Sequence, residues 1–222
     1  MNFPIEELRE SLKAFCNEEK RPWMEKYMKF KFPFIGVTSP DRSLVLKEFW
    51  PILKPKTNHE LKEWVQFLWQ LEEREYQYVA MELYFRNKKL WTSLDHEFIA
   101  FMVSTKSWWD TVDYIAANIA GEFFKLFPET FEKVMVKWIG SNDMWVNRTA
   151  IICQLKYRQK TNLEWLEKAI LPHTGSKEFF HQKAIGWALR QYAKTDAQWV
   201  IDFVERVTLK PLSVREALKH LK

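Results

Sequence analysis

Hydrophobic residues recur at intervals of three and four along most of the chain and almost never alternate with polar residues. This spacing is typical of amphipathic α-helices, whose apolar residues line one face. Two such stripes are Leu61, Trp64, Val65, Leu68 and Trp108, Val112, Ile115, Ile119. The pattern predicts an all-α protein of about twelve to fourteen short helices.

Signals for helix starts lie between the stripes. Ser39-Pro40 is typical of a cap residue followed by proline in the first turn. The segments Thr57–Glu60 and Ser213–Glu216 have the spacing of capping boxes. Asp110 stands three residues after Ser107, so we expect it to complete a cap and to complement the N-terminus of its helix.

Four segments align as the starts of similar helices: Glu75–Ala80, Trp108–Asp113, Trp145–Ala150 and Phe179–Ala184. Their last residues are separated by 33, 37 and 34 residues. A second helix is expected after each segment, beginning near Leu94, Pro128, Asn162 and Thr195. Because a repeated helix pair cannot bury its apolar face alone, such units stack. We therefore expect one domain over residues 1–222, an α-solenoid of HEAT-like pairs that winds as a right-handed superhelix and offers a concave face to an extended partner.

The composition fits a packed helical protein. Of the 222 residues 47% are hydrophobic and 12 are Trp, which excludes a disordered chain. Only 5 are Gly, which argues against folds that rely on glycine-rich phosphate loops. There is no run of 18 apolar residues and no secretory signal pattern, so we expect a cytoplasmic protein without a membrane partner. Cys16 and Cys153 are far apart and fit a reducing compartment.

The net charge of +5 is unevenly distributed. Residues 142–222 hold 14 Lys and Arg against 8 Asp and Glu, a net charge of +6, and a smaller basic run covers residues 20–31. This asymmetry suggests a polyanionic partner such as nucleic acid, although an ordinary solvated surface gives the same count.

One position breaks the repeat. Three of the aligned segments end in Ala80, Ala150 and Ala184, whereas the fourth ends in Asp113. A carboxylate at such a site needs a partner or a purpose. Trp109 lies four residues before Asp113, so the two share a helix face, which we expect Ala116, Ala117 and Ala120 to keep open. An interhelical salt bridge is the structural alternative for Asp113.

A basic stripe is expected on the last aligned helix. Its members Lys183, Trp187, Arg190 and Lys194 follow at i, i+4, i+7 and i+11. Cations interleaved with an indole suit a phosphate backbone and its sugars. Arg148, Lys156 and Arg158 could join this surface. A core Trp with a solvated basic edge is the alternative.

Other chemistry is weakly indicated. The five histidines show no metal-binding spacing, and neither a phosphate loop nor a nucleophile elbow is present, so no metal or cofactor is expected. Most other tryptophans have helix-packing spacing and are expected in the core: Trp64, Trp69, Trp138, Trp165 and Trp199.

Several motifs resemble the bacterial AlkD-like DNA alkylation repair glycosylases. They are Lys106-Ser-Trp-Trp-Asp-Thr-Val-Asp113, Trp145-Val-Asn-Arg148, Gln182-Lys-Ala-Ile-Gly-Trp-Ala-Leu-Arg190, Leu212-Ser-Val-Arg-Glu-Ala217 and the early Phe32-Pro-Phe-Ile-Gly36. The Trp-Trp-Asp-x-Val-Asp run is specific and the closing run less so. The resemblance covers almost the whole chain; Thr38 departs from it, since a longer polar side chain able to reach DNA is expected there.

The resemblance implies a HEAT-like solenoid that removes cationic alkylated purines, such as 3-methyladenine and 7-methylguanine, from double-stranded DNA and leaves an abasic site. It implies Asp113 as the catalytic carboxylate, Trp109 and Trp187 in the cleft, and Arg148 near the DNA backbone. Lys183, Arg190, Lys194 and Lys156 are expected to contact DNA, with the protein acting as a monomer. No lysine in the motif suggests a lyase step.

Two other functions remain open at this point. A solenoid that only binds unusual DNA structures would show salt-dependent binding without base release. A protein-interaction scaffold would not depend on the basic stripe. Neither alternative needs a lone carboxylate at Asp113, which favours the enzyme.

Overall fold

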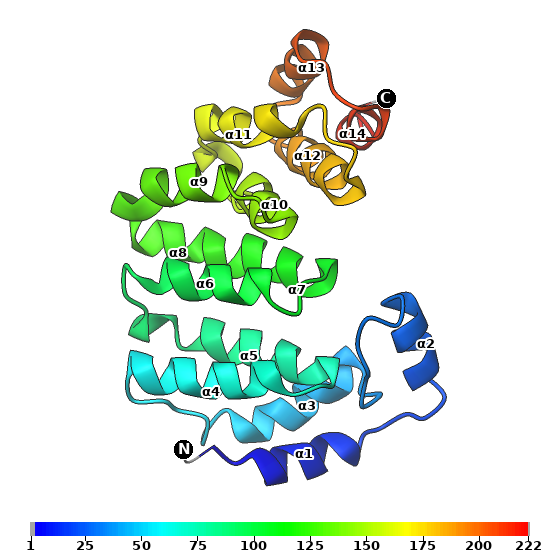
Figure 1. The fold of residues 1–222 in the computed structure, drawn as a ribbon, viewed down its shortest axis with the longest axis vertical. Coiled ribbons are helices and arrows are strands. Elements are labelled where there is room, and N and C mark those ends of the chain that lie inside the picture. The colour runs from blue at the N-terminus through cyan, green and yellow to red at the C-terminus, as the bar shows by residue number, and fades with distance from the viewer. Residues whose placement is uncertain (1–2, 222) are drawn as a thin grey trace. The chain divides into compact units, whose positions relative to one another are not determined.

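The computed structural model describes residues 3–221, and within them helices are the only regular secondary structure (Figure 1). This confirms the all-α prediction. The helices form two compact units, which follow one another in the sequence between Thr92 and Ser93. None of the described helices is long and apolar enough to cross a membrane.

The first unit contains five α-helices within the described residues. They are α1 (Ile5–Lys13), α2 (Arg21–Tyr27), α3 (Ser39–Phe49), α4 (Asn58–Gln70) and α5 (Arg74–Arg86). Helices α4 and α5 pack side by side and α1 packs on α3 (Figure 1). The predicted stripe of Leu61, Val65 and Leu68 is fully buried in this unit.

The second unit continues the helical order. It comprises α6 (Asp95–Ser104), α7 (Trp109–Tyr114), a π segment (Ile115–Ala120), α8 (Gly121–Leu126), α9 (Phe131–Ile139), α10 (Met144–Ile152), α11 (Leu163–Ile170), α12 (Phe179–Tyr192), α13 (Ala197–Arg206) and α14 (Pro211–Ala217). Because α7, the π segment and α8 are continuous, the described chain has thirteen separate helices, as the periodicity predicts.

The predicted helix pairs are present. Helices α5, α7, α10 and α12 begin within one residue of the four aligned segments, and α6, α9, α11 and α13 follow them. In the second unit α10 packs against α7 and the π segment on one side and against α12 on the other. Successive leading helices therefore stack, which is the arrangement expected of a solenoid.

Two of the aligned segments carry a side-chain amide at the same position, and both amides bind the end of the preceding helix. At the third aligned position, Gln77 donates from Nε2 to the carbonyls of Leu68, Trp69 and Leu71 at the end of α4. Asn147 in the same position donates from Nδ2 to Trp138, Ile139 and Ser141 at the end of α9. Each amide thus satisfies orphan carbonyls of the preceding helix.

The predicted caps have mixed outcomes. Thr57 caps α4 by accepting from the backbone N–H of Glu60 at 3.1 Å, as expected. Helix α3 begins at Ser39 itself, with Thr38 as its cap residue, and α7 begins after Trp108 rather than after Ser107. Ser107 Oγ instead donates to the carbonyl of Val103, while Asp110 lies in the first turn of α7, where it complements the helix N-terminus.

The capping box predicted at Ser213 is wrong. Helix α14 begins two residues earlier, at Pro211, and Ser213 Oγ donates to the carbonyl of Gln182 on α12 at 3.0 Å. The pattern was misread because this serine serves a neighbouring helix rather than its own N-terminus.

Two of the five glycines mark close helix contacts. A Cβ at Gly186 would lie 2.4 Å from Glu216 Cβ, and one at Gly121 would lie 2.6 Å from the carbonyl oxygen of Cys153. Glycine therefore lets α12 approach α14 and lets α8 approach the end of α10.

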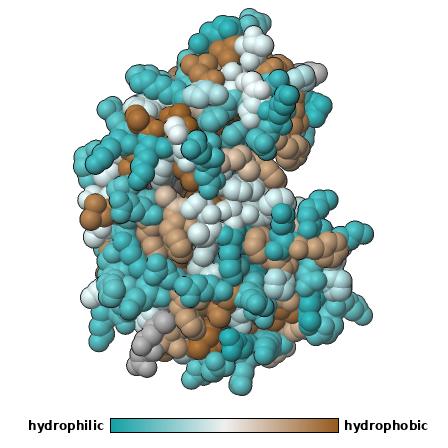
Figure 2. Space-filling view, viewed as in Figure 1, coloured by the Kyte–Doolittle hydropathy of each residue, from teal (hydrophilic) through white to brown (hydrophobic). Residues whose placement is uncertain are grey.

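Four of the five tryptophans named as core residues lie in the core. Trp64, Trp69, Trp138 and Trp165 are buried, whereas Trp199 is half-buried and stacks on Phe203. Hydrophilic residues cover much of the visible surface of both units (Figure 2).

Candidate functional site

Asp113 forms an ion pair with Arg148 across two helices of the second unit. Nε of Arg148 donates to Oδ1 of Asp113 at 2.7 Å, and Nη2 donates to Oδ2 at 2.9 Å. The Asp113 side chain is 18% exposed and the Arg148 side chain 4% exposed, so the pair is largely buried while the carboxylate keeps some access to solvent. The interhelical salt bridge considered from the sequence therefore exists, and it is bidentate, the strongest geometry for this pair.

Arg148 also reaches a third helix. Its Nη1 donates to the carbonyl of Phe180 on α12 at 2.6 Å. All three nitrogen atoms of the guanidinium thus have partners, which lie on α7 and α12 while the side chain extends from α10. Three of its five N–H donors are used in this way, and the side chain is only 4% exposed, so little of the guanidinium is accessible to a DNA phosphate.

The electrostatic state of Asp113 reflects two opposing effects. Burial raises the pKa of its carboxyl group above the ordinary value, while the hydrogen bonds and charge of Arg148 act in the opposite direction. The charge of Asp110, one turn earlier, adds a small further rise in the pKa of Asp113. The result is a carboxylate that is a better proton acceptor than an exposed aspartate.

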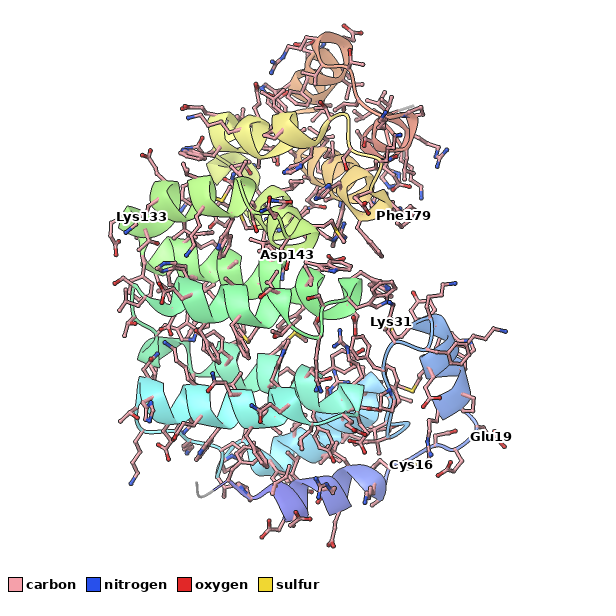
Figure 3. All side chains as sticks on the ribbon, viewed as in Figure 1. Cys16, Glu19, Lys31, Lys133, Asp143 and Phe179 are labelled. Atoms are coloured by element: carbon pink, nitrogen blue, oxygen red, sulfur yellow. The ribbon has the colours of Figure 1, made fainter. Side chains whose placement is uncertain are left out.

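Three aromatic side chains pack beside this ion pair. Phe180 lies edge-on to Trp108 with ring centroids 5.2 Å apart, and Trp145 lies 4.7 Å from Phe180 and 5.8 Å from Trp108. They come from the starts of α7, α10 and α12. Figure 3 labels Asp143, which precedes α10, and Phe179, which is the first residue of α12. This cluster fixes the helix ends that carry Asp113 and Arg148. Sequence reasoning missed the cluster, although the alignment put Trp108 and Trp145 at equivalent positions.

The two tryptophans expected at the site lie on two of its helices, α7 and α12. Trp109 is the first residue of α7, one turn before Asp113, and Trp187 lies in the middle of α12; both are half-buried. Both side chains therefore keep part of their surface exposed to solvent.

The alanine surface expected beyond Asp113 forms only in part, since Ala117 alone of the three alanines keeps some exposure. Ala116 and Ala120 are fully buried. They lie in the π segment, whose i→i+5 hydrogen bonds change the angular spacing of the residues, so the helical wheel that starts at Asp113 no longer applies. These alanines contribute to the core of the second unit instead.

Two of the three cations of the basic stripe, both on α12, pair with a single acid. Lys183 Nζ lies 3.1 Å from Oε1 of Glu216, and Arg190 Nη1 donates to Oε2 of the same residue at 3.0 Å. Lys194 is exposed and donates to Gln191 Oε1 at 3.0 Å. Glu216 on α14 was not singled out from the sequence, where its motif suggested a helix cap.

Lys156 reaches the continuous helix that carries Asp113. Its Nζ donates to Oδ1 of Asn118 in the π segment at 2.5 Å, and the residue is exposed. Asn118 Nδ2 in turn donates to the carbonyl of Tyr114, next to Asp113. The structure therefore brings Lys156 to the helix of the carboxylate, although not into contact with it.

The loop around Thr38 belongs to the first unit. Thr38 Oγ1 donates to Asp41 at 2.6 Å, so its hydroxyl is used within α3. The preceding loop is held by the buried carboxylate of Glu75, which accepts from the backbone N–H groups of Ile35, Gly36 and Val37 at 3.0 Å each. Glu75 therefore shapes this loop from within the fold.

The described residues contain no group of three or more His, Cys, Asp or Glu side chains that could hold a metal ion. The second unit contains a largely buried carboxylate with a raised pKa, a guanidinium that orients it, two half-buried indoles and several cations. Such a set can stabilise a developing positive charge and activate water near a polyanion.

Comparisons with known proteins indicate a role in DNA repair. Residues 8–221 match the family described as DNA alkylation repair enzyme. A solved structure described as a predicted DNA alkylation repair enzyme from Enterococcus faecalis is 36% identical, with a TM-score of 0.86, and the match covers 93% of this chain and 96% of that one. No curated protein matches the sequence.

Proposed function

Since the chain belongs to the DNA alkylation repair enzyme family, we propose that it is a monofunctional DNA glycosylase. Its substrates are purines alkylated to a cationic form, such as 3-methyladenine and 7-methylguanine in duplex DNA, and its product is an abasic site. The observation that carries this proposal is the bidentate, largely buried pair of Asp113 and Arg148, at a position where the other repeats have alanine.

The chemistry requires only one carboxylate. Glycosidases ordinarily use two, one of which protonates the leaving group. An alkylated purine already carries a positive charge, so when its bond to C1′ breaks, the electron pair neutralises the base and no acid is needed. Asp113 stabilises the positive charge that develops on the sugar, orients the water whose oxygen bonds to C1′, and accepts its proton.

Arg148 acts in this scheme as a positioning residue for Asp113. By holding both carboxylate oxygens it fixes the side chain in one rotamer, and by donating to Phe180 it ties that rotamer to α12. This role differs from the place near the DNA backbone that the sequence resemblance implies, because the guanidinium is buried and three of its N–H donors bind Asp113 and Phe180.

Trp109 and Trp187 are proposed to flank the deoxyribose. Their π-faces attract the cationic sugar and base, and their bulk excludes water other than the nucleophile. Lys183, Arg190, Lys194 and Lys156 are proposed to contact phosphates, which agrees with the excess of positive charge in residues 142–222.

A base-release assay tests the proposal. The wild-type protein is incubated with duplex DNA that contains 7-methylguanine, and free base and strand breaks are measured separately. We expect release of 7-methylguanine with intact, alkali-labile strands. Salt-dependent binding without any release would instead support a protein that only binds DNA.

A further inference from the structure

Glu216 connects Lys183 and Arg190, the first two cations of the basic stripe. Its two carboxylate oxygens bind different partners, with Oε1 3.1 Å from Lys183 Nζ and Oε2 3.0 Å from Arg190 Nη1. The carboxylate is only 13% exposed, while the lysine and arginine are 36% and 23% exposed. An acid that is largely covered thus holds two cations that are more exposed than itself.

The backbone places Glu216 at this point. Gly186 lies midway between the two cations on α12, and a Cβ there would be 2.4 Å from Glu216 Cβ. Ser213, one turn earlier on α14, donates to the carbonyl of Gln182. The contact between α12 and α14 therefore depends on the absence of a side chain at Gly186 and on the Ser213 hydrogen bond. Both hold the backbone of α14 where the Glu216 carboxylate reaches the two cations.

Lys183 and Arg190 begin far apart. Seven residues separate them, a rise of about 10 Å along a helix. Glu216 draws their charged ends toward one carboxylate, on either side of Trp187 in the sequence. Two long side chains that would each sample many rotamers are thereby restricted before DNA arrives.

The pairing also has an electrostatic cost for a protein that binds DNA. Burial alone would raise the pKa of Glu216, but the hydrogen bond from Lys183 and the charges of Lys183, Arg190 and Lys219 bring the pKa below its ordinary value. Glu216 is therefore ionised at neutral pH, and its charge cancels one of the two cations. An acid at this place is useful to DNA binding only if the order it imposes outweighs the charge it removes.

We propose that Glu216 is a positioning residue for DNA binding, which holds Lys183 and Arg190 as a preorganised clamp for backbone phosphates beside Trp187. The proposal rests on the proposed function only in that DNA is the ligand. Arg190 uses Nη1 for Glu216 and has further N–H donors for a phosphate, and Lys183 likewise has more than one.

The test is a double-mutant cycle on DNA binding. Glu216→Asp keeps the charge but withdraws the carboxylate by one methylene, so an effect of charge alone predicts no change. We expect about tenfold weaker binding to duplex DNA, equal to about 1.4 kcal/mol, with an unchanged rate of base release at saturating protein. In the Lys183→Met/Arg190→Met background the same substitution should have no effect on binding.

The matched control is Glu167→Asp, which changes an acid paired with Arg206 and outside the stripe; we expect it to bind DNA as the wild type does. If Glu216→Asp fails to fold, Glu216→Gln takes its place in the cycle, with a smaller loss expected because net positive charge increases. Wild-type affinity in the Glu216 variants, or a loss of equal size in the double-methionine background, would overturn the proposal. Binding is measured on undamaged DNA, so the double-mutant cycle does not depend on base release. If the wild type released no base, the glycosylase proposal would be refuted, and the cycle would still test the role of Glu216 in DNA binding.

Discussion

The Arg148 guanidinium donates hydrogen bonds to both oxygens of the Asp113 carboxylate, at 2.7 and 2.9 Å, and to the Phe180 carbonyl at 2.6 Å. Three successive leading helices of the repeat meet in this contact. Stability and the proposed chemistry therefore depend on the same pair of residues, and the two contributions can be separated experimentally.

Replacing Arg148 should harm stability and activity together. Arg148→Gln leaves a largely buried carboxylate without its cation, and breaking such a pair costs about 3 kcal/mol. We expect a lower free energy of unfolding in urea and slower base release even at temperatures where the variant is folded. Unaltered stability would show that the ion pair contributes little to holding α7, α10 and α12 together.

The pH profile of base release should report the environment of Asp113. Its raised pKa means that the reactive, ionised form is lost at a higher pH than for an exposed aspartate, so enzymatic release should decline on acidification from neutral pH. Arg148→Gln removes the effect that opposes this rise, and the acid limb should move to higher pH. The measurement is the single-turnover rate against pH, corrected for spontaneous depurination; identical profiles would exclude this coupling.

Gly186 should tolerate no side chain. Gly186→Ala places a Cβ 2.4 Å from Glu216 Cβ and 3.0 Å from the Ser213 carbonyl oxygen. Helix α14 must then move, at about 2 kcal/mol. Gly175→Ala is the matched control, because a Cβ there meets nothing within 4 Å. Thermal unfolding should show a clear drop in Tm for the first variant only.

Asn147 should be important for stability although it is remote from the proposed chemistry. Asn147→Ala removes the donor shared by three carbonyls at the end of α9, and buried carbonyls without partners cost about 1–3 kcal/mol. We expect a lower free energy of unfolding with near-normal base release under conditions where the variant is folded. Wild-type stability would show that solvent replaces the amide at no cost.

The sequence predicted those features that depend on local patterns. Leu61, Val65 and Leu68 were identified as core from helical spacing alone, and the Thr57 cap from its distance to Glu60. The aligned repeat identified Asp113 as unusual, because a carboxylate among alanines is visible without coordinates.

Features that depend on distant partners were missed. Ser213 and Glu216 have a capping-box spacing, yet their partners lie on α12, 31 and 26 residues away. The π segment after Tyr114 ended the simple helical wheel and buried Ala116 and Ala120, and spacing alone does not reveal such a change of hydrogen bonding. The Arg148 contact to Phe180 likewise depends on how α10 and α12 pack.

Release of 7-methylguanine by Asp113→Asn, compared with the wild type and with Asp110→Asn, tests the central claim most directly. Asp110 lies one turn earlier on the same helix and loses the same charge, so it controls for electrostatics and folding. The account predicts that Asp113→Asn binds alkylated DNA normally but releases base at least about 100-fold more slowly, while Asp110→Asn stays close to wild type. Comparable release by Asp113→Asn and the wild type would contradict it.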